Sequence, residues 1–140
     1  MHRLWLAVLV AEALSAGGCV TLPPQTAPVD PAQLVGQWRS LDFAGPSAGD
    51  FESMSLNLSA DGTFESGTQF SREGGTTLDG TYRVQGRKIL LDDDSGFRVT
   101  LPFHYDRDRL TVLRPARIGK VRVTLRRYVW KPPTEEDQDR

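Results

Sequence analysis

The sequence predicts an all-β protein, an eight-stranded antiparallel up-and-down β-barrel that follows a signal peptide and a proline-rich segment. Apolar and polar residues alternate between Val35 and Lys131, which is the period of strands with one buried face. Eight such runs follow one another at a spacing of about twelve residues per strand and turn, which is typical of barrels and sandwiches. The links between the runs are short, so successive strands form hairpins, and closing the sheet removes its edges.

The composition fits one soluble domain and excludes several classes of function. The chain has 140 residues, of which 39% are hydrophobic and 25% are charged, which suffices for one core. The formal net charge of −1 argues against nucleic-acid binding through net positive charge. One cysteine excludes an intramolecular disulfide, and two histidines argue against a histidine-rich metal site. We therefore expect no nucleic-acid partner, no bound metal and no cofactor.

Residues 1–18 have the features of a secretory signal. Arg3 precedes an apolar run, residues 4–14, which is too short to cross a bilayer stably. Residues 16–19 read Ala-Gly-Gly-Cys, which resembles the lipobox of bacterial lipoproteins. The resemblance implies cleavage before Cys19, a diacylglycerol on that cysteine and a membrane anchor in the bacterial cell envelope. Val20, where Asp commonly signals retention in the inner membrane, implies the outer membrane facing the periplasm. The alternative is an ordinary signal peptide with an incidental cysteine.

Two further segments flank the predicted domain, which spans residues 31–131. Residues 19–30 form a proline-rich tether, which in extended polyproline II would hold the domain about 30 Å from the lipid head groups. Residues 132–140 form an acidic tail that we predict to be disordered, with a partner-binding tail as the alternative. Asp30 offers an N-cap, with Pro31 at N1 and Gln33 at N3, so one helical turn is expected before the first strand.

The strands follow from the alternation and from the turn residues that interrupt it. The predicted strands are Val35–Leu41, Glu52–Ser59, Thr63–Phe70, Thr77–Val84, Lys88–Asp92, Phe97–Tyr105, Arg109–Arg114 and Lys120–Trp130. The turn-forming residues between them lie at 60–62, 74–75, 85–86, 94–96 and 106–108. The inward-facing residues are, in strand order, Met54, Leu56 and Leu58; Phe64 and Phe70; Leu78, Tyr82 and Val84; Phe97, Val99, Leu101, Phe103 and Tyr105; Leu110 and Val112; and Val121, Val123, Leu125, Arg127 and Val129.

Inward aromatic residues are the candidate lining of a ligand pocket, because pockets for small molecules are mostly apolar and aromatic. The candidate ligand-binding residues are Phe64, Phe70, Tyr82, Phe103 and Tyr105. Ser66, Thr68 and Gly80 lie among them and are too small to fill the space. The alternative is a barrel that is filled by its own side chains.

The start of the predicted domain resembles a known family. Residues 34–38 read Leu-Val-Gly-Gln-Trp, which resembles the Gly-x-Trp opening of lipocalins and other calycins. The runs SADGTFESG, LDGTYRVQGRKILL and DRDRLTVLR resemble small bacterial lipocalin-like lipoproteins, and the resemblance covers roughly Pro31 to Trp130. It implies a lipocalin-like barrel that binds a small apolar or amphipathic ligand.

Barrel closure is predicted to bring Trp38 and Arg127 together, because the first and last strands pair. Arg127 shares the inward parity of its strand, where an unpaired guanidinium would be costly. Stacking on the Trp38 ring, within about 6 Å, would stabilise it by roughly 0.5–2 kcal/mol. Lipocalins place a Trp and an Arg in a similar arrangement. The alternative is a bulge that turns Arg127 to solvent and brings in Arg126.

Two motifs suggest chemistry that the surrounding sequence does not support. Residues 45–49 match the G-x-S-x-G pattern of hydrolases, but no helix follows to form the required elbow. His104, the only histidine after the signal, lies on the polar face of its strand. Residues 92–94 are three aspartates without the spacing of a calcium-binding EF-hand loop. We predict a flexible loop and a solvated turn at these places, no catalytic residue and no enzymatic activity.

Basic residues gather near the end of the predicted barrel. They are Arg107, Arg109, Arg114, Arg117, Lys120, Arg122, Arg126, Arg127 and Lys131, against Asp108 alone. Such a basic face suits lipid phosphates or an acidic partner, although charged outer faces also serve solubility. Two functions follow: an anchored envelope protein that binds a small ligand, or a non-enzymatic scaffold or inhibitor that binds a periplasmic protein through its loops or its basic face.

Overall fold

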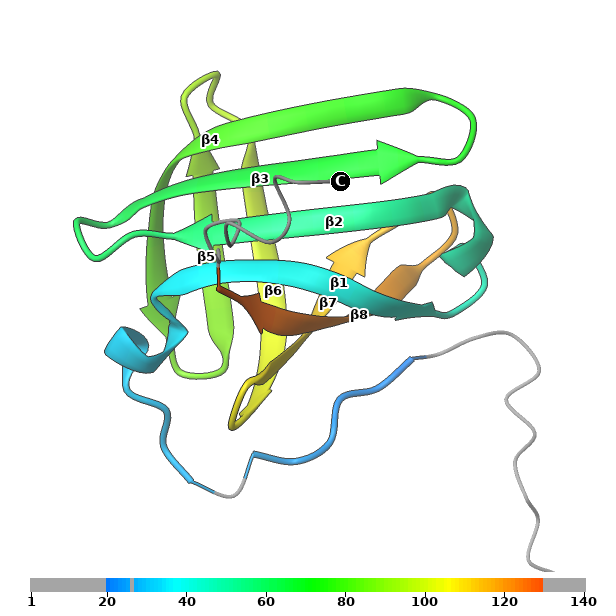
Figure 1. Cartoon of the computed structure of the whole chain (residues 1–140). Helices are drawn as coiled ribbons and strands as arrows, with labels where there is room; N and C mark the ends of the chain where they lie inside the picture. The colour runs from blue at the N-terminus through cyan, green and yellow to red at the C-terminus, as the bar shows by residue number, and fades with distance from the viewer. Residues whose placement is uncertain (1–19, 26, 130–140) are drawn as a thin grey trace, which may run out of the picture.

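Eight antiparallel strands pair in chain order and the last pairs with the first, so the sheet closes into a barrel (Figure 1). The computed structural model describes residues 20–25 and 27–129. The predicted signal peptide, Cys19 and the acidic tail lie outside these residues. The strands are β1 (Gly36–Ala44), β2 (Phe51–Leu58), β3 (Thr63–Phe70), β4 (Gly74–Gln85), β5 (Lys88–Asp93), β6 (Arg98–Asp106), β7 (Arg109–Pro115) and β8 (Lys120–Tyr128). The predicted fold class is confirmed.

The barrel has two ends, which we call the mouth and the base. The connections at residues 45–50, 71–73, 94–97 and 116–119 lie at the mouth, and those at 59–62, 86–87 and 107–108 lie at the base. At the base, the 3-10 helix η1 (Pro31–Leu34) precedes β1. Its capping box is the predicted one: Asp30 Oδ1 accepts from the Ala32 N–H, and the Asp30 N–H donates to Gln33 Oε1. None of the helices in residues 20–25 and 27–129 is long and apolar enough to span a membrane.

β1 is longer than predicted because a bulge at Leu41 interrupts the alternation. Ser40 pairs with Leu125 and Asp42 pairs with Thr124, so Leu41 is the extra residue and is 48% exposed. The bulge shifts the parity by one, which turns Asp42 outward and Phe43 inward, against the core. Period-two alternation stops at such a point, and the sequence-based boundary therefore falls at Leu41.

β4 is the longest strand and also exceeds its predicted range, which starts at Thr77. Its first part pairs with β3 and its last part with β5, and the two regions overlap at Gly80 and Thr81. A Cβ at Gly80 would overlap the backbone carbonyl oxygen of Asp92. A glycine is therefore required where β4 passes over the end of β5. The tight turn predicted at Gly74 and Gly75 lies instead at residues 71–73.

The hydrophobic core fills the base of the barrel more completely than the mouth. The fully buried side chains near the base are Leu34, Trp38, Leu56, Leu58, Ile89, Leu110 and Leu125. Each comes from the base end of its strand or from η1, so these side chains meet inside the closed sheet. On β8 the fully buried Val121 and Val123 continue the core toward the mouth, and the cavity found in the described residues lies there beside β2–β6.

The proline-rich segment lies along the barrel and does not hold it at a distance, which corrects the expected 30 Å spacing for the described residues. Gln25 Oε1 accepts from the Tyr105 N–H at 2.9 Å, and Gln25 Nε2 donates to the Tyr105 carbonyl oxygen at 3.1 Å. The Arg87 guanidinium donates to the Gln25 carbonyl oxygen at 2.9 Å. A glutamine side chain in place of a backbone peptide thus extends the hydrogen bonding of β6 and fixes this segment.

Candidate functional site

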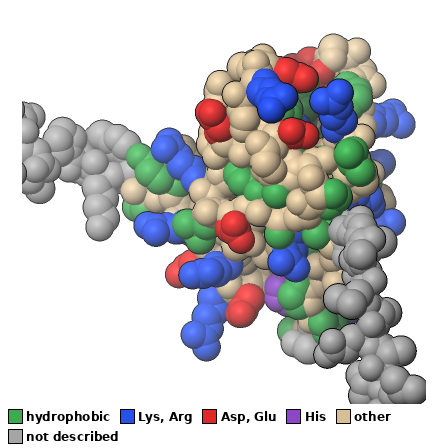
Figure 2. All heavy atoms as spheres, turned by 90° about the vertical axis from the view of Figure 1, so that its right-hand side faces the viewer, with side chains coloured by type: hydrophobic (Ala, Val, Ile, Leu, Met, Phe, Trp, Pro, Cys, Tyr) green, Lys and Arg blue, Asp and Glu red, His purple; other side chains and the backbone are tan. Residues whose placement is uncertain are grey.

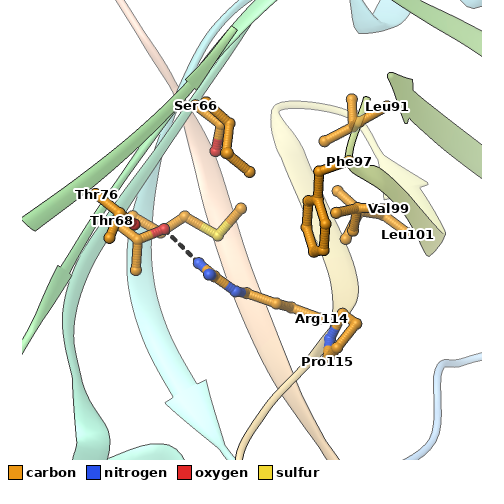
Figure 3. A pocket seen from close by; sticks show the side chains of 11 residues that line it. Ser66, Thr68, Thr76, Leu91, Phe97, Val99, Leu101, Arg114 and Pro115 are labelled. Atoms are coloured by element: carbon orange, nitrogen blue, oxygen red, sulfur yellow. Dashed lines mark hydrogen bonds between the residues drawn. The ribbon is translucent and has the colours of Figure 1, made fainter. Parts of the chain in front are cut away.

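A small cavity of about 110 Å³ lies inside the barrel toward its mouth (Figure 3). Its wall is mostly apolar, with four polar residues; the lining consists of Met54, Leu78, Leu91, Phe97, Val99, Leu101 and Pro115 together with Ser66, Thr68, Thr76 and Arg114. A cavity of this size can hold a short apolar part of a ligand but not a long chain. An apolar wall with a few converging polar groups is the usual composition of a small-molecule site.

A wider depression of about 490 Å³ adjoins the cavity at the mouth surface. Its wall includes Phe51, Phe70 and the charged residues Asp50, Arg72, Glu73 and Arg117. Arg114 and Pro115 line both spaces, so they form the boundary between the inner cavity and the outer depression. The two spaces together offer an apolar interior with a charged entrance.

Arg114 is the central polar residue of this site. Figure 3 shows its side chain reaching from β7 across the cavity toward Thr68 on β3, to whose hydroxyl oxygen its guanidinium donates a hydrogen bond. The guanidinium carbon lies 5.1 Å from the ring centre of Phe51 and 5.5 Å from that of Phe70. These distances are typical of cation–π interactions, which stabilise the guanidinium over the two aromatic rings.

The charge of Arg114 has no acidic partner in residues 20–25 and 27–129, where the ion pair within 4.0 Å joins Arg98 to Asp92. Burial lowers the pKa of Arg114, because desolvation disfavours the charged form. Arginine nevertheless stays charged at neutral pH, because its ordinary pKa lies far above neutrality. A positive charge is therefore held inside the mouth, supported by one hydroxyl group and two rings but not neutralised.

The strands at the mouth position this charge by aligning aromatic rings beneath it. Phe51 pairs with Phe70 across β2 and β3, and the extra residue Glu52 in β2 restores the inward parity of Met54. The rings of Phe51 and Phe70 are 5.2 Å apart, and the ring of Phe43 stacks on Phe51 at 5.4 Å. Both bulges therefore bring aromatic side chains to one side of the mouth.

The five aromatic residues predicted to line a pocket are divided between the two ends. Phe64 and Phe103 are buried in the core, and Tyr82 and Tyr105 pack against it near the base. Phe70 lines the outer depression, and none of the five lines the inner cavity. The cavity thus lies closer to the mouth than the aromatic pattern predicts, because the large rings fill the base. Ser66 and Thr68, the small inward residues, do line it.

Trp38 and Arg127 meet at the base as the sequence predicts. They are direct partners in the pairing of β1 with β8, and the guanidinium carbon lies 4.3 Å from the centre of the Trp38 ring. Arg127 also donates to the carbonyl oxygens of Gln33 and Val35, both at 2.7 Å, and the Trp38 indole N–H donates to the Leu34 carbonyl oxygen at 2.9 Å. The pair therefore fastens η1 across the seam where the barrel closes.

The G-x-S-x-G segment has a structural role at the mouth and is not the flexible loop that the sequence predicts. Residues Ala48–Asp50 form a short 3-10 helix, η2, and Ser47 is only 3% exposed. Ser47 Oγ accepts from the Ile118 N–H at 3.0 Å and donates to the Ile118 carbonyl oxygen at 3.3 Å. The serine thus joins two mouth connections, whereas His104 lies on β6 near the base, at the opposite end of the barrel.

Of the aspartates at residues 92–94, Asp92 and Asp93 have different side-chain partners. Asp92 pairs with Arg98 at 2.9 Å, and Asp93 accepts a hydrogen bond from the Ser95 hydroxyl, which lowers the pKa of Asp93. Over the described ranges, no three His, Cys, Asp or Glu side chains gather in a way that could hold a metal ion. These carboxylates therefore make separate local contacts in and around the β5–β6 turn and do not form a shared site.

Arg114 is one of the basic residues predicted to form an outer face, but its side chain lines the inner cavity. The signal for its true position is its parity: it follows Leu110 and Val112 at intervals of two, and both of these are buried. The charge of Arg114 predicts an outward side chain and its position in the strand predicts an inward one, and the inward prediction is correct.

No protein-family model and no curated protein matches the sequence significantly. Among solved structures, the fold is similar to the crystal structure of a lipoprotein YedD from Klebsiella pneumoniae subsp. pneumoniae MGH 78578. The two are 20% identical over 81% of this chain and 84% of that chain, with a TM-score of 0.50. A lipocalin-like protein from Bacteroides uniformis ATCC 8492 is 17% identical over 69% of this chain and 99% of that chain, with a TM-score of 0.45. The first likeness agrees with the lipocalin-like barrel that the sequence predicts, and it concerns the fold alone.

Proposed function

We propose that this chain is a lipid-anchored lipoprotein of the bacterial outer membrane, facing the periplasm, whose barrel binds a small amphipathic ligand at its mouth without catalysing a reaction. The observation that carries the ligand proposal is Arg114, a charge without an acidic partner at the boundary of an apolar cavity. Burying an unpaired charge is costly, and an acidic group of a ligand would neutralise it. The ligand is therefore an amphiphile with an acidic end at Arg114 and a short apolar part in the cavity.

The division of the cavity wall supports this orientation of the ligand. Met54, Leu91 and Val99 are among the apolar residues that line the inner cavity alone, whereas Arg114 lines both the cavity and the outer depression. The hydroxyl groups of Ser66 and Thr76 line the same cavity and add hydrogen-bonding capacity. A matched pair of probes separates the two parts of the ligand: octanoate carries the acidic group and 1-octanol lacks it.

Arg114→Met is expected to weaken octanoate binding by about tenfold to a hundredfold, the value of one hydrogen bond to a charged group. Binding of 1-octanol should change little, because the apolar wall remains. The free energy of unfolding should stay equal or rise, since the substitution removes a buried unpaired charge and keeps the volume. Isothermal titration of the purified protein with both probes, and urea unfolding, measure these effects.

The matched control is Arg109→Met, which removes a charge from the exposed outer face of the same strand. It should leave octanoate binding unchanged. Saturable octanoate binding that is equal in both variants would contradict the role of Arg114. Absence of saturable binding to the unmodified protein would favour the second candidate, a scaffold that binds a periplasmic protein, which the well-filled base of the barrel also suits.

The anchor is tested by Cys19→Ser. Serine cannot form the thioether to a diacylglycerol, so the variant should move from the membrane fraction to the soluble periplasmic fraction. Mass spectrometry of the mature N-terminus should find an acylated Cys19 in the unmodified protein. Membrane association that persists in the variant, together with an unmodified Cys19 in the parent chain, would refute the anchor.

A further inference from the structure

Val20, the first described residue, lies beside the mouth of the barrel. A Cγ atom of Val20 lies 3.2 Å from the position that a Cβ would occupy at Gly45, and the Lys120 carbonyl oxygen lies 3.0 Å from the same position. Gly45 and Lys120 flank two of the mouth connections. The Arg122 guanidinium donates to the Thr21 carbonyl oxygen at 3.4 Å. The proline-rich segment then runs along the barrel toward Gln25, near the base (Figure 1).

The β7–β8 connection next to Val20 presents an apolar side chain on a fixed backbone. Ile118 is 63% exposed, although both its N–H and its carbonyl oxygen are bonded to the buried Ser47 hydroxyl. A second exposed apolar side chain, Phe97, lies at the end of the β5–β6 connection and is 58% exposed. Ile118 and Phe97, which also lines the inner cavity, thus make the rim of the mouth partly apolar.

The charges beside Ile118 fit a surface of lipid phosphates. Arg117, Lys120 and Arg122 belong to the β7–β8 connection and the start of β8, on the side where Val20 lies. Figure 2 views the molecule from the right-hand side of Figure 1 and shows hydrophobic side chains across this face, with Lys and Arg side chains around them and some acidic ones between. Basic side chains near an anionic bilayer contribute about 1 kcal/mol each.

We propose that the mouth of the barrel faces the membrane, with Ile118 in the interfacial region of the bilayer and Arg117 and Lys120 at the phosphates. This inference rests on the proposed acyl anchor at Cys19, because the anchor would lie one residue before Val20. Anchor and loop would then form two contacts with the same bilayer, and two contacts fix an orientation that a single flexible anchor does not. The entrance to the Arg114 cavity would open onto the lipid surface, where acidic amphiphiles are concentrated.

The test compares two labelled positions at opposite ends of β3 in the full lipidated protein, reconstituted in vesicles of phosphatidylglycerol and phosphatidylethanolamine. Glu73→Cys places a thiol in the β3–β4 connection at the mouth, and Ala60→Cys places one in the β2–β3 connection at the base. The two sites are about 25 Å apart along an eight-residue strand. Because the acylated Cys19 has no free thiol, an introduced cysteine is the only site for a fluorophore, which spin-labelled lipid then quenches.

Quenching should be several times stronger at position 73 than at position 60. Ile118→Glu in the Glu73→Cys background should reduce that difference, while circular dichroism and thermal unfolding confirm that the barrel is intact. Equal quenching at both positions in a chain whose Cys19 is shown to be acylated by mass spectrometry would overturn the orientation and leave the anchor in place. An unmodified Cys19 in a chain that does not bind vesicles would overturn both.

Discussion

Replacement of Trp38 by alanine is expected to lower the free energy of unfolding by about 3–5 kcal/mol, the usual cost of removing a large buried aromatic side chain. Trp38 has 0% exposure and lies in the core at the base. Its indole N–H donates to the Leu34 carbonyl oxygen, and its ring lies 4.3 Å from the guanidinium carbon of Arg127. Alanine would therefore leave a cavity, an unpaired carbonyl oxygen on η1 and a guanidinium without its stacking partner.

Urea unfolding followed by circular dichroism measures this loss, with the denaturant slope checked for two-state behaviour. Leu41→Ala is the matched control on the same strand, because Leu41 is the bulged, partly exposed residue of β1. Its cost should stay within about 0.5–1 kcal/mol. Similar losses in the two variants would mean that Trp38 does not fill the base of the barrel as described.

Gly80→Ala is expected to destabilise the barrel by about 3 kcal/mol, the upper end of the usual cost of overpacking. The added Cβ would overlap the backbone carbonyl oxygen of Asp92, which cannot move away as the end of a flexible side chain can. Gly80 is paired with Asp93, so relief requires separation of β4 from β5 at this point. Leu91 and Leu78, on these two strands, line the cavity, and octanoate binding should weaken as well.

The control for this substitution is Gly49→Ala, which adds the same methyl group where no heavy atom lies within 4 Å. It should change the free energy of unfolding by no more than about 0.5 kcal/mol. Thermal unfolding of the two variants side by side distinguishes the local overlap from a general effect of replacing glycine. A Gly80→Ala protein as stable as the parent would show that β4 does not pass this close to β5.

Strand order and closure could be predicted from the sequence because hairpin turns and period-two alternation are local signals. The same alternation places Trp38 and Arg127 at equivalent positions on the first and last strands, and β1 and β8 pair at these residues. The bulge at Leu41 could not be predicted in this way, since an extra residue reverses the parity of everything after it. Phe43 and Asp42 therefore face opposite to a simple continuation of the pattern.

The position of the cavity depends on volume, which alternation does not contain. Inward parity is shared by Phe64 and Ser66, yet the large ring is packed in the core and the small hydroxyl group leaves space. The inward position of Arg114 follows from its parity with Leu110 and Val112, although its charge favours an outward position. Gln25 has no local signal at all, because its bonds to Tyr105 join residues 80 positions apart.

The closure of β8 onto β1 also affects the order in which the chain can fold. Arg127 and its acceptor Val35 are 92 positions apart, so the seam forms only after nearly the whole barrel has been synthesised. Contacts between such distant residues have a high entropic cost of loop closure. They therefore form more slowly than local hairpins. Hairpins such as β2–β3 can form early, but the buried base, η1 and Trp38 must wait for the last strand. A nascent chain therefore stays incompletely folded until its C-terminal strand is available.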